Sequence, residues 1–332
     1  MLKFYSKKKL LAHTNPRNGE LKFGQAAITV GSLKELKDKP QQYVLLGIPE
    51  DIGVRANSGK PGASKAWEAT LSSLCNIQQT QYCQAHNVIV LGELDCSQQM
   101  QQAETLKPSD THYLEKLGEL VTQIDHMVTQ VIEKIVGQGK IPIIIGGGHN
   151  NSFGNLKGAS KALEKSINCI NFDAHTDFRA LEHRHSGNGF SYAAEEGFLN
   201  KYFIFGLHRN YTSQAVFDSM AEVSDTVQFS FFEDISVKNK KTFTEALQEA
   251  EAFCTQQPFG LEIDLDAVAN MGSSAMTPSG FSLEECRRFL HYFSAKKTCT
   301  YIHICEGAPN RELFPGQVGK AIAYLLSDVI SE

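Results

Sequence analysis

The sequence predicts an α/β protein with three layers, in which an eight-stranded, mainly parallel sheet lies between helices. Eight short apolar runs alternate with segments of helical periodicity. Runs that are apolar on both faces and are separated by helices are typical of a parallel sheet covered on each side. The expected strands are residues 43–48, 88–91, 141–145, 167–172, 202–206, 226–231, 259–265 and 300–305.

Several helices between these runs carry their own signals. Residues 112–137 place apolar side chains at spacings of three and four and end at Gly137, as in an amphipathic helix. Thr242 with Glu245, and Ser282 with Glu285, fit the capping box ahead of apolar periodicity. We expect the last helix at residues 317–330.

The composition indicates an ordinary globular chain. Its 332 residues are 42% hydrophobic and 21% charged, and large α/β sheets of this length occur as single domains. The sequence contains no internal repeat, low-complexity segment or linker. We therefore expect one domain over residues 1–332, with residues 1–40 as a polar N-terminal extension packed on it.

Charge and hydropathy exclude several classes of function. The net charge of −5 and the pI near 6.1 provide no basic surface for nucleic acid. No apolar run approaches the roughly 18 residues of a membrane span, and the N-terminus lacks the apolar region of a secretory signal. The eight cysteines contain no CxxC pair, which favours buried thiols in a reducing compartment. We expect a cytoplasmic protein.

Polar side chains follow the strand predicted at residues 167–172. Asp173, His175 and Asp177 occupy every second position, so they can converge on one side of the strand end. Two carboxylates and an imidazole gathered there are unfavourable without a cation. The pattern therefore favours a metal site.

Three other predicted strands end in unusual residues. After residues 141–145 come three glycines and then His149. Asp264 and Asp266 follow the apolar residues 259–263, and Glu306 follows residues 300–305. Taken separately, His149 fits a hydrogen-bonded loop histidine, and the two aspartates fit a helix cap or surface turn. Because parallel strands collect their carboxyl ends at one edge, the six histidines and aspartates together indicate two ions about 3.5–4 Å apart. Oxygen-rich ligands favour Mn²⁺ ahead of Zn²⁺.

The sequence elements GGGH (146–149), DAHTD (173–177) and DLD (264–266), in this order and at these separations, resemble the ureohydrolase family of arginase, agmatinase and formimidoylglutamase. Residues 47–55, GIPEDIGVR, followed by Asn57, Gly59 and the PGA at 61–63, resemble the first substrate loop of that family, and formimidoylglutamases most closely. The resemblance covers roughly residues 43–325 and implies the arginase-like fold.

The resemblance implies two Mn²⁺ ions per chain. One would be held by His149, Asp173, Asp177 and Asp264, and the other by His175, Asp173, Asp264 and Asp266. A hydroxide shared by the ions would attack the carbon of an amidine or guanidinium group. By the same resemblance Asp177 carries a proton to the departing nitrogen, and Glu306 pairs with the cationic C–N group of the substrate.

We expect the loops around the metal site, above all the loop after the DAHTD segment, to determine which substrate binds. Arginases and agmatinases usually have a histidine before the glycine of the loop after DAHxD, whereas this chain has Ser186 there, as in formimidoylglutamases. His185, one residue earlier, fits either a proton shuttle or a simple loop histidine. Arg179 suits a substrate with more carboxylate, because its planar fork binds carboxylate in a bidentate way.

Further substrate contacts are expected from Arg55, Asn57 and Asn188, while Arg209 fits either a substrate contact or an ordinary surface ion pair. The sequence departs from the family pattern at Asn150, Gly189 and residues 307–308, and none of these positions is an expected metal ligand. The departures leave the amino-acid part of the substrate open.

The function expected from this resemblance is hydrolysis of N-formimidoyl-L-glutamate to L-glutamate and formamide, in histidine degradation. One alternative is an arginase or another guanidino-acid hydrolase that releases urea. An alternative of a different class is a catalytically silent metal-binding member of the family. The resemblance also implies a homo-oligomer, although no segment of the sequence identifies an interface.

Overall fold

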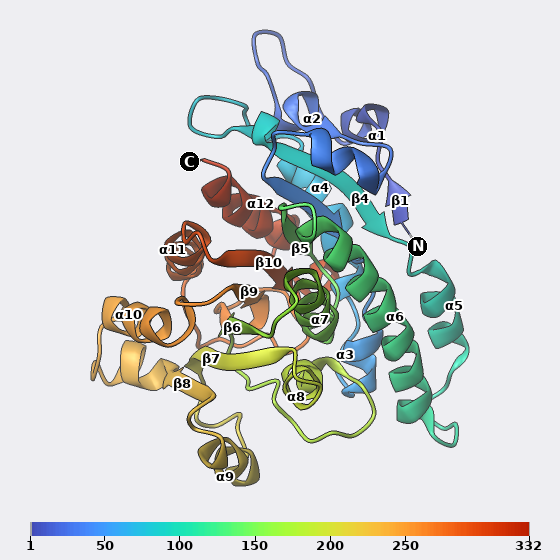
Figure 1. Cartoon of the computed structure of the whole chain (residues 1–332). Coiled ribbons are helices and arrows are strands. Elements are labelled where there is room, and N and C mark those ends of the chain that lie inside the picture. Colours follow the sequence, from blue (N-terminus) through green and yellow to red (C-terminus); the bar gives the residue numbers. More distant parts are fainter. Residues whose placement is uncertain (1, 332) are drawn as a thin grey trace.

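The computed structural model describes residues 2–331, and its centre is one twisted sheet (Figure 1). Ten strands join the sheet in the order β1-β4-β3-β5-β10-β9-β6-β7-β8, and β2 also pairs with β4. The strands are β1 (Leu2–Phe4), β2 (Ile28–Thr29), β3 (Tyr43–Gly47), β4 (Val88–Leu94), β5 (Ile141–Ile145), β6 (Ile167–Phe172), β7 (Leu199–Leu207), β8 (Val227–Phe231), β9 (Phe259–Asp264) and β10 (Cys299–Cys305).

The eight strands expected from the sequence are confirmed as β3 to β10, and all pairs between them are parallel. The sequence predicted eight strands, whereas the sheet contains ten within the described residues. Strand β1 pairs antiparallel with β4, and the two-residue β2 pairs parallel with it. The described part of the N-terminal region thus extends the sheet edge. Strands of two or three residues are too short to carry a hydrophobic period, so the sequence did not reveal them.

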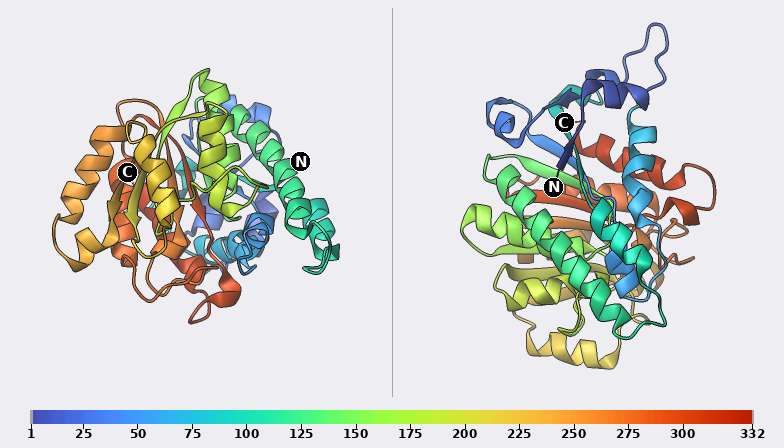
Figure 2. Two further views of the ribbon diagram at one scale, coloured as in Figure 1. Left: turned by 90° about the horizontal axis from the view of Figure 1, so that it is seen from below. Right: turned by 90° about the vertical axis from the view of Figure 1, so that its right-hand side faces the viewer.

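Helices cover both faces of the sheet (Figures 1 and 2). They are α1 (Lys7–Ala12), α2 (Phe23–Ala26), α3 (Ile52–Ala56), α4 (Ala66–Leu74), α5 (Ser97–Thr105), α6 (Tyr113–Val136), α7 (Asn151–Leu163), α8 (Gly189–Glu195), α9 (Gln214–Glu222), α10 (Phe243–Cys254), α11 (Leu283–Ser294) and α12 (Gln317–Val329). The expected helices at 112–137 and 317–330 correspond to α6 and α12. The capping boxes at Thr242 and Ser282 begin α10 and α11 as expected.

The sheet has one hydrophobic core on each face, because successive strand residues point to opposite faces. On β5, Ile143 and Ile145 pack into the core under α4, α10, α11 and α12. Ile144, between them, packs into the core under α6 and α7. The strands are thus apolar on both faces, and this explains why their sequences read as nearly continuous apolar runs.

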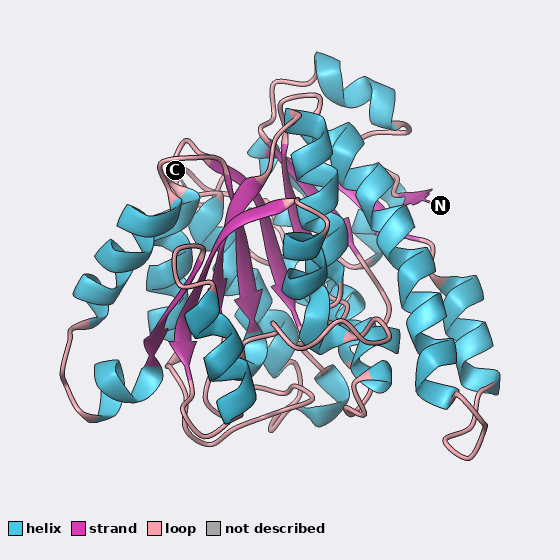
Figure 3. Cartoon of the chain, turned by 60° about the horizontal axis from the view of Figure 1, so that its bottom comes forward, coloured by secondary structure: helices cyan, strands magenta, loops and turns pink. Residues whose placement is uncertain are grey.

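The parallel strands place their carboxyl ends at one edge of the sheet, and long loops gather there (Figure 3). The residues expected to bind metal lie on these loops or, for Asp264, at the end of β9. No helix within residues 2–331 is both long enough and apolar enough to cross a lipid bilayer. The eight cysteines form no disulfide, and all but Cys83 are buried.

Candidate metal centre

His149 is placed by a tight turn between β5 and α7. Gly146 and Gly147 adopt φ values of 85° and 75°, a left-handed conformation that glycine adopts without strain. The buried carboxylate of Glu50 fastens this turn, because it accepts hydrogen bonds from the Gly148 N–H at 3.1 Å and from Asn151 Nδ2 at 2.6 Å. Burial raises the pKa of Glu50. His149 is thereby fixed with its side chain fully buried.

Asp173, His175 and Asp177 converge through a turn, whereas we expected from the sequence that they would converge because side chains alternate along a strand. Strand β6 ends at Phe172, so strand alternation does not extend to His175 and Asp177. Instead, the His175 N–H donates to Asp173 Oδ1 at 2.7 Å, and Asp177 has a φ of 43°. The expected convergence itself is confirmed, since all three side chains meet other acidic groups or histidines of the centre.

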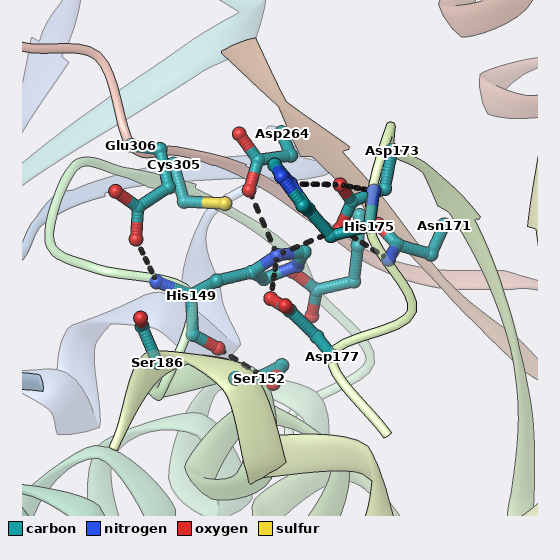
Figure 4. Close-up of polar contacts among 12 residues, drawn as sticks. His149, Ser152, Asn171, Asp173, His175, Asp177, Ser186, Asp264, Cys305 and Glu306 are labelled. Carbon is teal, nitrogen blue, oxygen red and sulfur yellow. Dashed lines mark hydrogen bonds and ion pairs between the residues drawn. The ribbon is translucent and has the colours of Figure 1, made fainter. Parts of the chain in front are cut away.

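The first group of candidate ligands surrounds Nδ1 of His149 (Figure 4). This nitrogen lies 2.8 Å from Asp177 Oδ2, 3.1 Å from Asp264 Oδ2 and 3.3 Å from Asp173 Oδ2. These four residues come from the loops after β5 and β6 and from the last residue of β9, which are distant in sequence. They are the four expected at one ion.

The second group contains His175, Asp173 and Asp266. His175 Nδ1 lies 3.4 Å from Asp266 Oδ1 and 3.5 Å from Asp173 Oδ1. Asp173 thus offers one oxygen to each group, as a carboxylate that bridges through both oxygens does. Asp264 was also expected to bridge, but only its Oδ2 joins the first group, and its Oδ1 accepts a hydrogen bond from the Asp266 N–H at 2.8 Å.

The clustered carboxylates disfavour one another's charge. Burial, followed by the charges of Asp266 and Asp173, raises the pKa of Asp264 well above its usual value. Burial and the charge of Asp173 likewise raise the pKa of Asp177. Burial also opposes ionisation of Asp173, but the neighbouring His149 and His175 outweigh it and lower the pKa of Asp173.

The donors fit divalent metal ions. Both ring nitrogens of His149 and the Oδ1 of Asp266 are buried without any hydrogen-bond partner among the residues that the structure describes. Such atoms are costly unless another group satisfies them. Four carboxylates and two imidazoles form an oxygen-rich set that suits hard or borderline divalent cations. We conclude that these residues are suited to hold two ions.

A cavity of about 630 Å³ opens onto both ligand groups. His175, Asp177, Asp264 and Asp266 line its metal end, together with Glu306. Burial and the charge of Asp266 raise the pKa of Glu306 to about 8. Asn57, Lys60, Arg179, Ser186 and Tyr211 line other parts of the wall.

Arg179 and Asn57, two of the expected substrate contacts, lie together in this wall. Arg179 Nη1 donates to Asn57 Oδ1 at 2.5 Å, and its Nη2 donates to Glu182 Oε1 at 3.2 Å. The Arg179 side chain is 51% exposed, so its guanidinium is accessible to solvent. Asn57 Nδ2 donates to Ser186 Oγ at 3.1 Å. These contacts join the first substrate loop to the loop after β6.

The structure does not place His185 at the reacting centre. Its side chain is 1% exposed and does not line the cavity. Its Nδ1 accepts a hydrogen bond from the Gly187 N–H at 3.0 Å, and its Nε2 faces Glu182 Oε1 at 3.0 Å. With both nitrogens engaged in the loop, His185 fits the alternative of a simple loop histidine, and we do not assign it a proton shuttle.

Three other candidates also lie outside the cavity lining. Arg55 donates to Glu104 and to the Ala103 carbonyl, and Asn188 holds the His183 carbonyl and the His185 N–H. Arg209 pairs with Asp234 at 2.5 Å, so it fits the surface ion pair. The geometry therefore does not support substrate contacts from Arg55 or Asn188, because their polar atoms are already used to hold loops.

Sequence reasoning missed Lys60 and Tyr211. The Tyr211 ring stacks on the imidazole of His175, with 5.1 Å between the ring centroids and 16° between the planes. Both residues lie in loops without hydrophobic periodicity. For Lys60 the available signal was its place inside the segment that resembles the first substrate loop.

Fold and site together define an α/β protein with a candidate two-metal centre at the carboxyl ends of its parallel strands. A model of the Arginase family matches residues 41–330. This match covers most of the sequence, and the chain belongs to the arginase family.

The relatives agree with the resemblance seen in the sequence. A formimidoylglutamase of Geobacillus sp. is 26% identical over 272 residues, which cover 80% of this chain and 76% of that protein. The structure of formimidoylglutamase from Bacillus subtilis superposes with a TM-score of 0.72 at 17% identity, covering 96% of this chain and 93% of that chain. Formiminoglutamase of Trypanosoma cruzi, crystallised with Mn²⁺, has a TM-score of 0.71 at 18% identity and coverages of 94% and 98%. The arginase-like fold is therefore confirmed.

Proposed function

We propose that this chain is a binuclear manganese hydrolase that cleaves linear amidine C–N bonds, with N-formimidoyl-L-glutamate as its preferred substrate. The observation that carries the proposal is the pair of ligand groups that share Asp173 at one end of a single cavity. The relatives named formimidoylglutamase support the choice of substrate.

The two ions are proposed to be held by His149, Asp173, Asp177 and Asp264 in one position and by His175, Asp173 and Asp266, with Asp264, in the other. Bound ions of this kind supply a nucleophile near neutral pH by lowering the pKa of water. Mn²⁺ is favoured by the oxygen-rich ligands, and the Trypanosoma cruzi relative was crystallised with it. The same residues also suit other hard divalent ions, so the metal must be measured.

The chain's own residues would guide the reaction on the cavity side. Asp177 lines the cavity beside Glu306, and we propose that it transfers a proton from the attacking water to the departing nitrogen. Glu306 would pair with the cationic formimidoyl group and orient it. Water adds to the amidine carbon and the bond to the glutamate nitrogen breaks, so the products are formamide and L-glutamate.

Two cations are available for the carboxylates of the substrate. Arg179 and Lys60 both line the cavity, and the Lys60 side chain lies in an exposed segment. Formimidoyl-glutamate carries two carboxylates, whereas arginine carries one and agmatine none. Two cations in one wall thus favour the dicarboxylate substrate over the guanidino alternatives.

The remaining expectations concern the number of domains, the location in the cell and the oligomeric state. We propose that the chain forms one domain, which is supported by the joining of strands from residue 2 to residue 305 in one sheet. We also propose a cytoplasmic homo-oligomer: the location is supported by the eight free cysteines, and the oligomer rests on the family resemblance alone.

The decisive test is hydrolysis by protein loaded with Mn²⁺, in which formamide and urea are measured separately. We expect formamide from N-formimidoyl-L-glutamate, and we expect chelation to abolish it. Urea from arginine or another guanidino acid, without formamide, would move the assignment to the alternative hydrolase. Metal binding without turnover of any of these compounds would favour the catalytically silent member.

A further inference from the structure

A buried polar network lies directly behind the candidate metal centre, on the neighbouring strands β9 and β10. Glu262 and His303 are direct partners in the parallel pairing of these strands. His303 Nδ1 lies 2.5 Å from Glu262 Oε2, and the Tyr301 hydroxyl donates to Glu262 Oε1 at 2.8 Å. All three side chains are fully buried.

A glycine allows this network to form. A Cβ atom at Gly260 would lie between 2.2 and 2.4 Å from the ring and hydroxyl of Tyr301, far inside the contact distance of such atoms. Glycine therefore lets the Tyr301 ring lie against β9 and brings its hydroxyl to the Glu262 carboxylate two residues further along. The strand thus holds a carboxyl group at a position where the core would otherwise be apolar.

Glu262 also faces the histidine of the first ligand group. Its Oε2 lies 3.5 Å from Nε2 of His149, on the side of the ring away from the aspartates that surround Nδ1. Nε2 makes no hydrogen bond that meets normal geometry among the described residues, and the Cys305 thiol, which is a poor acceptor, also lies close to His149 and Glu262. The imidazole thus lies between one carboxylate behind it and three in front.

This arrangement matters because an imidazole that binds an ion through Nδ1 carries its hydrogen on Nε2. That hydrogen needs an acceptor in a buried site, and the acceptor fixes both the tautomer and the ring orientation. We propose that Glu262 is a positioning residue that holds His149 with Nδ1 free to bind, and so tightens the ion in the first ligand group. The inference rests on the proposed function, in that it requires metal at this group.

The test is equilibrium binding of Mn²⁺ to metal-free protein, measured by competition with a chelating dye. We expect wild type to bind two ions, and Glu262→Gln to bind one of them about 10–100-fold more weakly while the other is unchanged. Glutamine lacks the charge, and because the Tyr301 hydroxyl donates to its oxygen, the amide N–H₂ faces His149 and cannot accept the Nε2 hydrogen. Tyr301→Phe is the matched control, because it removes a partner of the other carboxylate oxygen, and both affinities should remain those of wild type.

The possible outcomes separate this inference from the proposed function. Failure of wild type to bind Mn²⁺ would overturn the proposed function. Equal affinities in wild type and Glu262→Gln would overturn only the role of Glu262. If Glu262→Gln does not fold, a second measurement can be made on the wild-type protein. This is ¹⁵N NMR of the histidine side chains in Zn²⁺-loaded protein. The His149 signals are assigned as those that disappear in His149→Asn. We expect a protected hydrogen on Nε2, and a hydrogen on Nδ1 would contradict the inference.

Discussion

The carboxylate of Glu306 accepts a hydrogen bond from the backbone N–H of His149 at 2.9 Å, and this bond ties the end of β10 to the turn that carries a candidate metal ligand. Glu306 has a φ of 60°, in the left-handed region, which is uncommon for a residue other than glycine. Figure 4 shows the two residues side by side at the metal centre. The residue proposed to orient the substrate thus also helps to position the turn that carries His149.

Glu306→Gln should separate these two roles. The glutamine oxygen can still accept the His149 N–H, so Mn²⁺ content should remain at two ions per chain. Two bound cations and a cationic substrate would favour the ionised form of Glu306 despite its raised pKa in the metal-free site. The substitution removes that charge, and we expect kcat/KM to fall by about 10²–10³. Steady-state kinetics and metal analysis of the purified variant test this. Loss of metal together with activity would show that Glu306 acts mainly through the turn.

Asp264→Asn should abolish most of the stabilisation that metal gives. In the metal-free protein, burial and the charges of Asp266 and Asp173 raise the pKa of Asp264, so asparagine, which cannot ionise, should leave the Tm equal or higher. In wild type, saturating Mn²⁺ should raise the Tm, since a ligand at 100 times its Kd adds about 2.7 kcal/mol. The variant should lose most of this rise. Thermal unfolding with and without chelator measures both, and the exposed Asp218→Asn should behave as wild type.

Arg179→Gln should raise KM more than it lowers kcat. A hydrogen bond to a charged group contributes about 1.5–3 kcal/mol, so removal of the guanidinium should weaken binding of a dicarboxylate roughly 10–100-fold. Arg55→Gln is the control, because Arg55 pairs with Glu104 outside the cavity lining. Equal effects of the two substitutions on KM would contradict the role proposed for Arg179.

His185 should make the protein less stable in mild acid. Burial lowers the pKa of His185 from 6.5 to about 4, so between these pH values the unfolded chain binds a proton that the folded chain does not. The free energy of unfolding should therefore fall as the pH drops from 6.5 to 4, and this contribution should level off below pH 4. Urea unfolding of wild type and His185→Asn at pH 7.5 and 5 tests this.

His185→Asn should lose less stability between the two pH values than wild type, since asparagine does not titrate and its oxygen can accept the Gly187 N–H. Because His185 does not line the cavity, His185→Asn should also keep most of the activity, and a loss of several orders of magnitude would restore the proton shuttle.

The sequence by itself determined the eight parallel strands and the six candidate ligands. The strands were legible because burial on both faces requires apolar side chains at nearly every position. The ligands were legible because histidines and aspartates directly after such runs have few purely structural uses. The sequence also indicated the relevant family, through the order and spacing of three motifs, as the match over residues 41–330 confirms.

Only the tertiary structure decided which polar residues face the cavity. Asn57 and Asn188 look alike in sequence, but Asn57 lines the cavity and Asn188 holds a buried loop. Likewise, Glu262 lies within an apolar run, and its partners His303 and Tyr301 belong to another strand about 40 residues away in the sequence. Side-chain direction and contacts between distant segments depend on how strands and loops pack, and no local pattern of residue types records them.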